Sequence, residues 1–213
     1  PLYQTSIFCN INFRAVPKPV TANPLLAQLL APEPPTFRVG SAAASRCPEC
    51  GGPADPAADG LAPCPICRLG WIAAWEPGRV RLALIPELAQ GPLNALVVRL
   101  TLALMAAARG AAAGAGRPPK PAPDGARAVE AARQNRLLAA LQGRVAATRA
   151  ALPFAASPLV LRQTLLALPA SRRAALVAEL GGLRYLPEPG DPEVARWFRR
   201  RLALAPPDPP PAD

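Results

Sequence analysis

Four of the five cysteines stand in two pairs, and their spacing constrains the fold more than any other feature. Cys47 and Cys50 form the first pair and Cys64 and Cys67 the second, in the pattern C-x2-C-x13-C-x2-C. Two residues between cysteines let both sulfurs point at one ion, and two such pairs complete a tetrahedron of thiolates. We therefore expect these four residues to bind Zn²⁺. The ion is expected to be structural, because four thiolate ligands leave no coordination position open.

Two disulfides are the less favoured alternative, because the chain opens without a visible secretory signal and both pairs have metal-site spacing. The fifth cysteine, Cys9, is expected to be a small buried hydrophobe. The sequence has no histidine, which excludes Ser-His-Asp and Cys-His catalysis. No glycine-rich phosphate loop and no paired carboxylates are found. We therefore expect a protein that is not an enzyme and takes no small-molecule substrate.

The cysteine motif resembles that of the zinc-ribbon family, whose knuckles commonly read CPxCG. Positions 47, 48, 50 and 51 match the first knuckle, and positions 64, 65 and 67 match the second. Arg68 stands where the family usually has a glycine. The resemblance implies a small β module over residues 46–84, with hairpin-like strands at 71–75 and 80–84. It covers roughly a fifth of the chain, and it points to a metal rather than to a particular function.

The rest of the chain reads as mainly α-helical. We expect an apolar helix at 86–109, a flexible linker at 110–123 and a basic helical bundle at 124–204. The bundle is expected to fold without residues 1–90, because its apolar faces can pack together. Four residues with capping side chains are predicted to start helices: Asp124, Ser157, Ser171 and Asp191.

Proline is concentrated toward both ends of the chain. Residues 1–45 are predicted to form a strand at 1–13 and an extended arm, interrupted by one short helix at 25–30. Residues 205–213 form a Pro-rich tail. Extended arms bury too little apolar surface to fold alone, so they point to a large assembly. The predicted class is mainly α with a small zinc-ribbon β module (46–85) and Pro-rich extended arms at both ends.

The net charge of +10 is unevenly placed. Residues 91–213 contain 17 basic and 8 acidic side chains, whereas residues 1–90 contain 7 and 6. A basic half of this kind typically meets a polyanion, although a solvated surface is the alternative explanation. Two helices have arginines opposite an apolar face, which in the first includes Leu137, Leu138, Leu141, Val145 and Leu152. The candidate RNA-binding residues are Arg133, Arg136, Arg144, Arg196, Arg199 and Arg200. Their neighbours Trp197 and Phe198 are expected to lie in the core.

These features together favour a non-enzymatic structural component of a large assembly. The first hypothesis is a basic, zinc-binding peripheral protein of a ribonucleoprotein such as an organellar ribosome, with ribosomal RNA and neighbouring proteins as partners. The alternative is a protein–protein adaptor of an organellar or viral complex, which docks through residues 93–108 and the Pro-rich arms without contacting RNA. A DNA-binding transcription factor is less favoured, because the cysteine module is nearly neutral.

The expected location is an intracellular, reducing compartment, with the mitochondrial matrix favoured. Reduced cysteines suit such a compartment. The apolar stretch at 93–108 contains Arg99 and has sixteen residues, whereas a membrane span takes about 20. We therefore expect no transmembrane segment.

Overall fold

The computed structural model describes residues 23–33, 46–52, 63–76, 78–114, 124–188 and 190–204. Within these ranges the chain forms seven α-helices, two short 3₁₀ turns and one two-stranded antiparallel sheet. This confirms the predicted class of a mainly helical protein with a small β component. The predicted strand at 1–13, Cys9, most of the N-terminal arm and the C-terminal tail lie outside the described residues.

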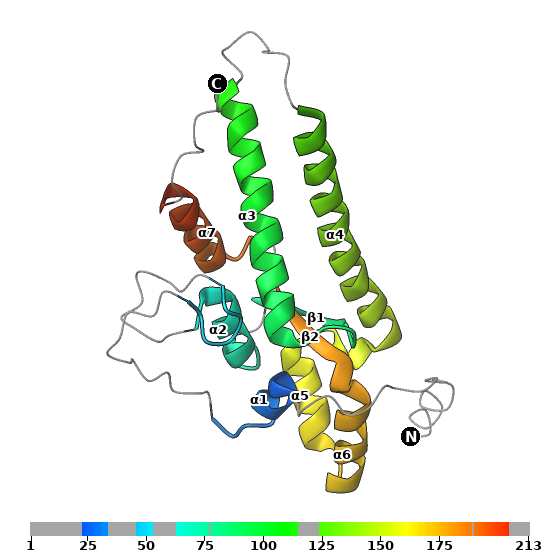
Figure 1. The fold of residues 1–213 in the computed structure, drawn as a ribbon. Coiled ribbons are helices and arrows are strands. Elements are labelled where there is room, and N and C mark those ends of the chain that lie inside the picture. Colours follow the sequence, from blue (N-terminus) through cyan, green and yellow to red (C-terminus); the bar gives the residue numbers. More distant parts are fainter. Residues whose placement is uncertain are drawn as a thin grey trace.

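The two longest helices, α3 and α4, lie side by side and rise from the sheet (Figure 1). Helix α7 packs against α3, while α5 and α6 lie at the other end of the molecule (Figure 1). The helices are α1 (Pro24–Leu29), α2 (Pro65–Ile72), α3 (Gln90–Gly114), α4 (Asp124–Ala151), α5 (Pro158–Ala167), α6 (Ala170–Glu179) and α7 (Pro192–Leu204). The 3₁₀ turns are η1 (Pro153–Ala155) and η2 (Leu180–Gly182), and the strands are β1 (Val80–Leu84) and β2 (Leu183–Pro187).

The sheet joins two segments that lie far apart in the sequence. Strand β1 pairs antiparallel with β2, in a register that places Leu82 opposite Tyr185 and Leu84 opposite Leu183. β1 comes from the predicted zinc-ribbon module, and β2 comes from the predicted helical bundle. These two parts of the chain therefore share one sheet and one hydrophobic core.

The hairpin implied by the zinc-ribbon resemblance is wrong in its first strand. Residues 71–75 are not extended: α2 continues to Ile72, and the N–H of Trp75 bonds to the Ile72 carbonyl in the turn that follows. A helix forms here because Cys64 takes the N-cap position and Pro65 the first helical position, where the fixed φ of proline suits a helix. Because residues 71–75 form no strand, β1 pairs with β2 instead.

Local capping signals are confirmed at two of the predicted helix starts. The Ser157 hydroxyl accepts a bond of 3.3 Å from the N–H of Val160, with proline at the first position of α5. One carboxylate oxygen of Asp191 accepts the N–H groups of Glu193 and Val194, each at 3.0 Å. Each cap satisfies donors that the first helical turn leaves free.

Other predicted boundaries shift. Helix α6 begins at Ala170, so Ser171 lies inside the first turn and is not the cap. Helix α4 begins at Asp124 itself. Helix α3 continues to Gly114, because the alanine-rich residues that follow position 109 favour a helix. The predicted linker therefore starts later, and residues 115–123 lie outside the described part of the chain.

Helix α3 is apolar along most of its length. Its stretch Gln90–Arg109 has 20 residues and is long and apolar enough to cross a membrane by length and composition alone; 33% of it is buried inside the protein. This stretch is longer than the sixteen residues counted from the sequence. Core helices of soluble proteins meet the same criteria, and Leu93, Val97 and Val98 of α3 belong to the core. Length and composition therefore do not assign α3 to a membrane.

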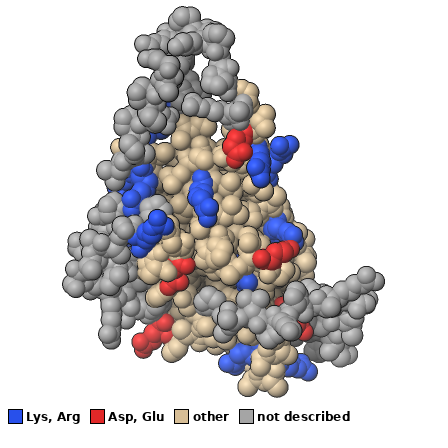
Figure 2. All heavy atoms as spheres, viewed as in Figure 1, with Lys and Arg blue, Asp and Glu red and all other residues tan. Residues whose placement is uncertain are grey.

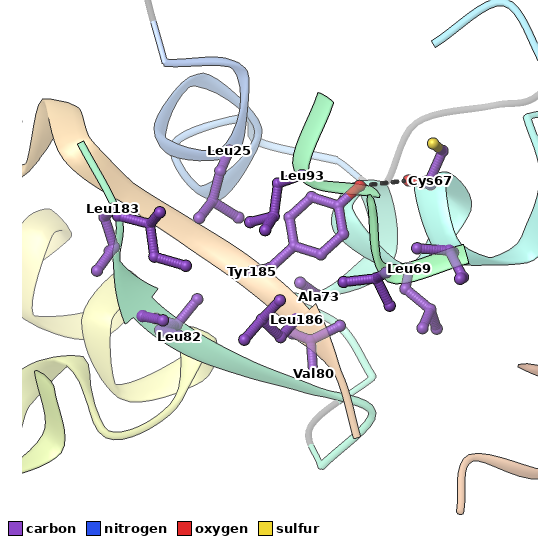
Figure 3. Close-up of a cluster of buried hydrophobic side chains, with 14 of the residues drawn as sticks. Leu25, Cys67, Leu69, Ala73, Val80, Leu82, Leu93, Leu183, Tyr185 and Leu186 are labelled. Atoms are coloured by element: carbon purple, nitrogen blue, oxygen red, sulfur yellow. Dashed lines mark hydrogen bonds between the residues drawn. The ribbon is translucent and has the colours of Figure 1, made fainter. Parts of the chain in front are cut away.

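The core runs without a break from the sheet to the cysteines. Figure 3 shows the ring of Tyr185 between Leu93 and Leu69, with its hydroxyl beside Cys67. The same cluster of buried side chains includes Trp197, which is 0% exposed, and three of the four paired cysteines. Folding of the core and formation of the cysteine site are therefore linked.

Candidate metal centre

The first cysteine pair lies on a tight turn. The N–H of Gly51 bonds to the carbonyl of Cys47 at 2.9 Å, and the N–H of Cys47 bonds to the carbonyl of Gly52 at 2.7 Å. Gly51 has a φ of 68°, a left-handed conformation that glycine adopts readily. The turn also brings the N–H of Gly52 to within 3.4 Å of the Cys50 sulfur. The CPECG sequence thus builds a metal-binding turn.

The second cysteine pair lies at the start of α2. Cys64 is the N-cap residue and Cys67 lies in the first turn, so the C-x2-C spacing brings both side chains to the same end of one helix. The N-terminus of a helix carries a partial positive charge, which stabilises thiolates. The N–H of Cys64 donates to the Cys47 sulfur at 3.3 Å, which connects the two pairs directly.

The four sulfurs form one cluster. All four Sγ atoms lie within 4.8 Å of one another, and those of Cys50 and Cys64 are 3.8 Å apart. A tetrahedral zinc with Zn–S bonds near 2.3 Å places its sulfurs about 3.8 Å apart. All four cysteines are free rather than disulfide-bonded, and three of them are buried. The geometry and the donor set therefore fit a tetrahedral metal ion, and the predicted metal ligands are brought together.

The close contacts among the sulfurs shift the pKa values of their thiols in opposite directions. The pKa of the Cys47 thiol is lowered, because its sulfur accepts hydrogen bonds from Cys50 and the other two cysteines. The pKa values of the Cys64 and Cys67 thiols are raised, first by their interactions with Cys47. Each further ionisation thus adds negative charge to a buried site. A divalent cation among the sulfurs offsets that charge.

A layer of polar side chains surrounds Cys67. The amide of Asn94 in α3 donates to the Cys67 sulfur at 3.2 Å and to the Tyr185 hydroxyl at 2.8 Å. The Tyr185 hydroxyl in turn donates to the carbonyl of Cys67 at 3.1 Å (Figure 3). Gln90 donates to the Asn94 amide oxygen at 2.8 Å and to the Tyr185 carbonyl at 3.0 Å. These buried groups orient one ligand and connect it to α3 and β2.

The sequence motif did not predict Asn94, Gln90 or Tyr185 as part of the site. One signal was present: Asn94 is an uncharged polar residue within the largely apolar segment predicted as a buried helix. A buried amide needs hydrogen-bond partners, and here one of them is the sulfur of Cys67 in the cysteine cluster. The pKa of the Tyr185 hydroxyl is raised by burial and by the adjacent charge of Cys67, so this hydroxyl remains a donor.

Close packing fixes α2 against β2. A Cβ atom placed on Gly70 would lie 2.1 Å from the ring of Tyr185, so a side chain at this position would displace the ring. The same ring carries the hydroxyl that bonds to Cys67. The distance between helix and strand at Gly70 therefore determines whether Tyr185 reaches the metal site.

Ion pairs connect the metal-binding helix to α7. Arg68, which replaces the glycine usual in zinc ribbons, lies in α2 and pairs with Glu193 of α7. Arg79 donates to both carboxylate oxygens of Asp191, at 2.7 and 3.1 Å, and also pairs with Glu193. The second cysteine pair lies on a helix, and a helix needs no glycine after Cys67, so an arginine fits at position 68.

The six candidate RNA-binding arginines are exposed and divided between two helices. Figure 2 shows basic side chains spread across the face from α7 to α4, with acidic side chains beside those over α4. On α4, Arg133 lies 3.8 Å from Glu130 and Arg144 lies 3.1 Å from Glu87, while Arg136 has no ion pair among the described residues. Arg196, Arg199 and Arg200 are exposed on α7, whereas Trp197 and Phe198 are buried, as expected. The structure therefore does not join the six arginines into one patch on this face.

The apolar face of α4 is only partly covered. Val145 and Leu152 are buried, but Leu137 is 42% exposed. Leu138 and Leu141 line a cavity of about 380 Å³ between α3, α4 and α7. Helix α4 therefore exposes apolar surface around Leu137, Leu138 and Leu141 that the rest of the described chain does not cover.

No match to this chain was found among protein-family models, curated proteins or solved structures.

Proposed function

We propose that the protein is a non-enzymatic, zinc-stabilised component of a large intracellular assembly. The observation that carries the metal part of this proposal is the cluster of four free cysteines whose sulfurs lie within 4.8 Å of one another. Four thiolates in a tetrahedron suit zinc or iron, and zinc is the usual occupant of a closed structural site. We therefore assign the cluster a structural zinc ion, in a reducing compartment.

The proposed partner is RNA, in a ribonucleoprotein such as an organellar ribosome. Support comes from the excess of arginine in residues 91–213 and from the exposure of all six candidate arginines. The guanidinium group pairs bidentately with phosphate, and an amphipathic helix with an arginine face can follow a phosphate backbone. In this proposal the zinc centre holds α2 and α7 in place, and RNA is contacted by α4 and α7.

A protein–protein adaptor without RNA contact is the second candidate. The cavity between α3, α4 and α7 favours it, because this cavity is lined by apolar side chains such as Met105, Leu138 and Phe198. Exposed apolar surface of this kind is typical of protein interaction sites. The adaptor hypothesis predicts binding that depends little on salt.

Replacing exposed arginines with glutamine distinguishes the RNA-binding proposal from the adaptor hypothesis. The first variant converts Arg133, Arg136 and Arg144 to Gln, and the second converts Arg196, Arg199 and Arg200 to Gln. Binding of a single-stranded RNA is measured between low and moderate salt by fluorescence anisotropy. Three lost phosphate contacts should lower the log–log salt slope by about 2. A matched control converts three exposed arginines outside α4 and α7: Arg99, Arg109 and Arg172. Equal affinity in all three variants would contradict the RNA proposal and favour the adaptor.

A further inference from the structure

A second cavity, of about 270 Å³, lies beside the metal centre at the N-terminal end of α3. The beginning of α3, the first cysteine turn, α1, α2 and β2 all contribute to its lining. Among the lining residues are Gln28, Glu49, Gln90, Gly91 and Arg184. Glu49 is exposed and Gln28 is partly buried.

Arg184 is a buried cation with no counter-charge among the described residues. Its side chain is almost fully enclosed, with an exposed fraction of 3% for the residue. The guanidinium Nε and Nη1 atoms donate to the carbonyls of Leu88, Gly181 and Leu183, at 2.6 to 2.8 Å. Among the described residues no carboxylate pairs with Arg184, and Nη2 has no hydrogen-bond partner. A buried charge of this kind is stabilised by an anion in the adjoining cavity.

The start of α3 supplies further donors at the same cavity. The helix has 25 residues, and its N-terminal end carries a partial positive charge. The backbone N–H groups of Gln90 and Gly91 make no hydrogen bond to other described residues. A helix N-terminus with free N–H groups beside a buried arginine is a favourable site for an oxyanion.

We propose that this cavity binds a small oxyanion, a phosphate or a carboxylate, through Arg184 and the N-terminal N–H groups of α3. The Nη2 group of Arg184, which the three carbonyls leave free, can donate a charge-assisted hydrogen bond to an oxygen of either group. The carboxylate of Glu49 lines the same cavity and opposes the anion, so it lowers the affinity. Gln28 lines the cavity without a side-chain hydrogen bond to the described residues, so its replacement leaves the core contacts intact.

Calorimetric titration of the full-length, metal-loaded protein with inorganic phosphate tests the proposal. Ionic strength is held constant with chloride, and a parallel titration with acetate separates phosphate from carboxylate recognition. We expect saturable binding of at least one of the two anions at one site per chain. Gln28→Glu should weaken binding about tenfold, and Glu49→Gln should tighten it about tenfold, from the charge added or removed. Glu130→Gln on α4 is the matched control and should leave the affinity unchanged.

Arg184→Lys keeps the charge but removes the Nη2 donor, and it should weaken binding several-fold. Should this core variant fail to fold, the Gln28 and Glu49 variants still decide the question, because neither side chain belongs to the core. Absence of saturable binding for both anions would overturn the proposal. So would equal affinities in Gln28→Glu and Glu49→Gln.

Discussion

The side chain of Asn94 donates a hydrogen bond to the sulfur of Cys67, at 3.2 Å between Nδ2 and Sγ. Both residues are buried, and Asn94 lies on α3 while Cys67 lies on α2. A neutral amide at this position stabilises a thiolate without neutralising it. Helix α3, which is apolar along most of its length, thus contacts the cysteine cluster through a polar residue.

Replacing Asn94 with Ala should therefore weaken metal binding. Loss of such an outer hydrogen bond typically raises the dissociation constant about 10- to 100-fold. Competition with a chromogenic chelator measures the change. Asn135→Ala, at an exposed position of α4, is the control and should bind metal like the unmodified protein. Equal affinities for Asn94→Ala and the control would mean that this contact does not support the ligand.

Replacing Gly70 with Ala should destabilise the protein by overpacking. The new Cβ would lie 2.1 Å from the Tyr185 ring, and such collisions in a packed core cost about 1–3 kcal/mol. Urea denaturation of the metal-loaded protein gives the difference in unfolding free energy. Gly143→Ala in α4 is the control, because the new Cβ would meet no other atom within 4 Å. It should stabilise the helix by roughly 0.5–1 kcal/mol. An unchanged unfolding free energy in Gly70→Ala would show that the close approach of α2 to β2 is not needed for stability.

Asp191 should contribute stability that depends on pH. Burial alone would raise its pKa, but the hydrogen bonds from Arg79 and from the N–H of Val194 outweigh this effect, and the pKa of the carboxyl lies below its usual value. The contribution is therefore fully present above the unfolded pKa and is lost as pH falls through the lower folded pKa.

The variant Asp191→Asn isolates this contribution, because it keeps an acceptor for the helix cap and removes the charge. At pH 7 it should lose about 2 kcal/mol, the range for hydrogen bonds to charged groups. Both proteins release metal in acid, so the readout is the difference between their unfolding free energies. That difference should be constant down to about pH 5 and shrink below about pH 4. A difference that grows in acid would contradict this reading.

Local signals in the sequence predicted the local structure well. Ser157-Pro158 and Asp191-Pro192 mark helix starts because the cap and the fixed proline φ act within one turn. The cysteine spacing predicted which four residues gather, since each pair needs only a turn or one helical turn. The buried positions of Trp197 and Phe198 followed from helical periodicity.

Long-range relationships were not predictable in the same way. The pairing of β1 with β2 depends on elements that are distant in the sequence, and the segment at 183–187 had no alternation that marked it as a strand. Independent folding of residues 124–213 stays a prediction. The shared sheet argues against it, because such a fragment would leave β2 without its partner strand. Gln90 and Tyr185 join the metal site only through that arrangement.

The four clustered cysteines are proposed to bind one structural zinc ion. The most direct test is the metal content of the purified full-length protein, measured by mass spectrometry of the elements together with the number of reactive thiols. We predict one zinc per chain, four thiols protected until the metal is removed, and loss of the zinc in Cys50→Ser but not in the control Cys9→Ser. Disulfide bonds among Cys47, Cys50, Cys64 and Cys67, iron in place of zinc, or unchanged metal content in Cys50→Ser would contradict the account.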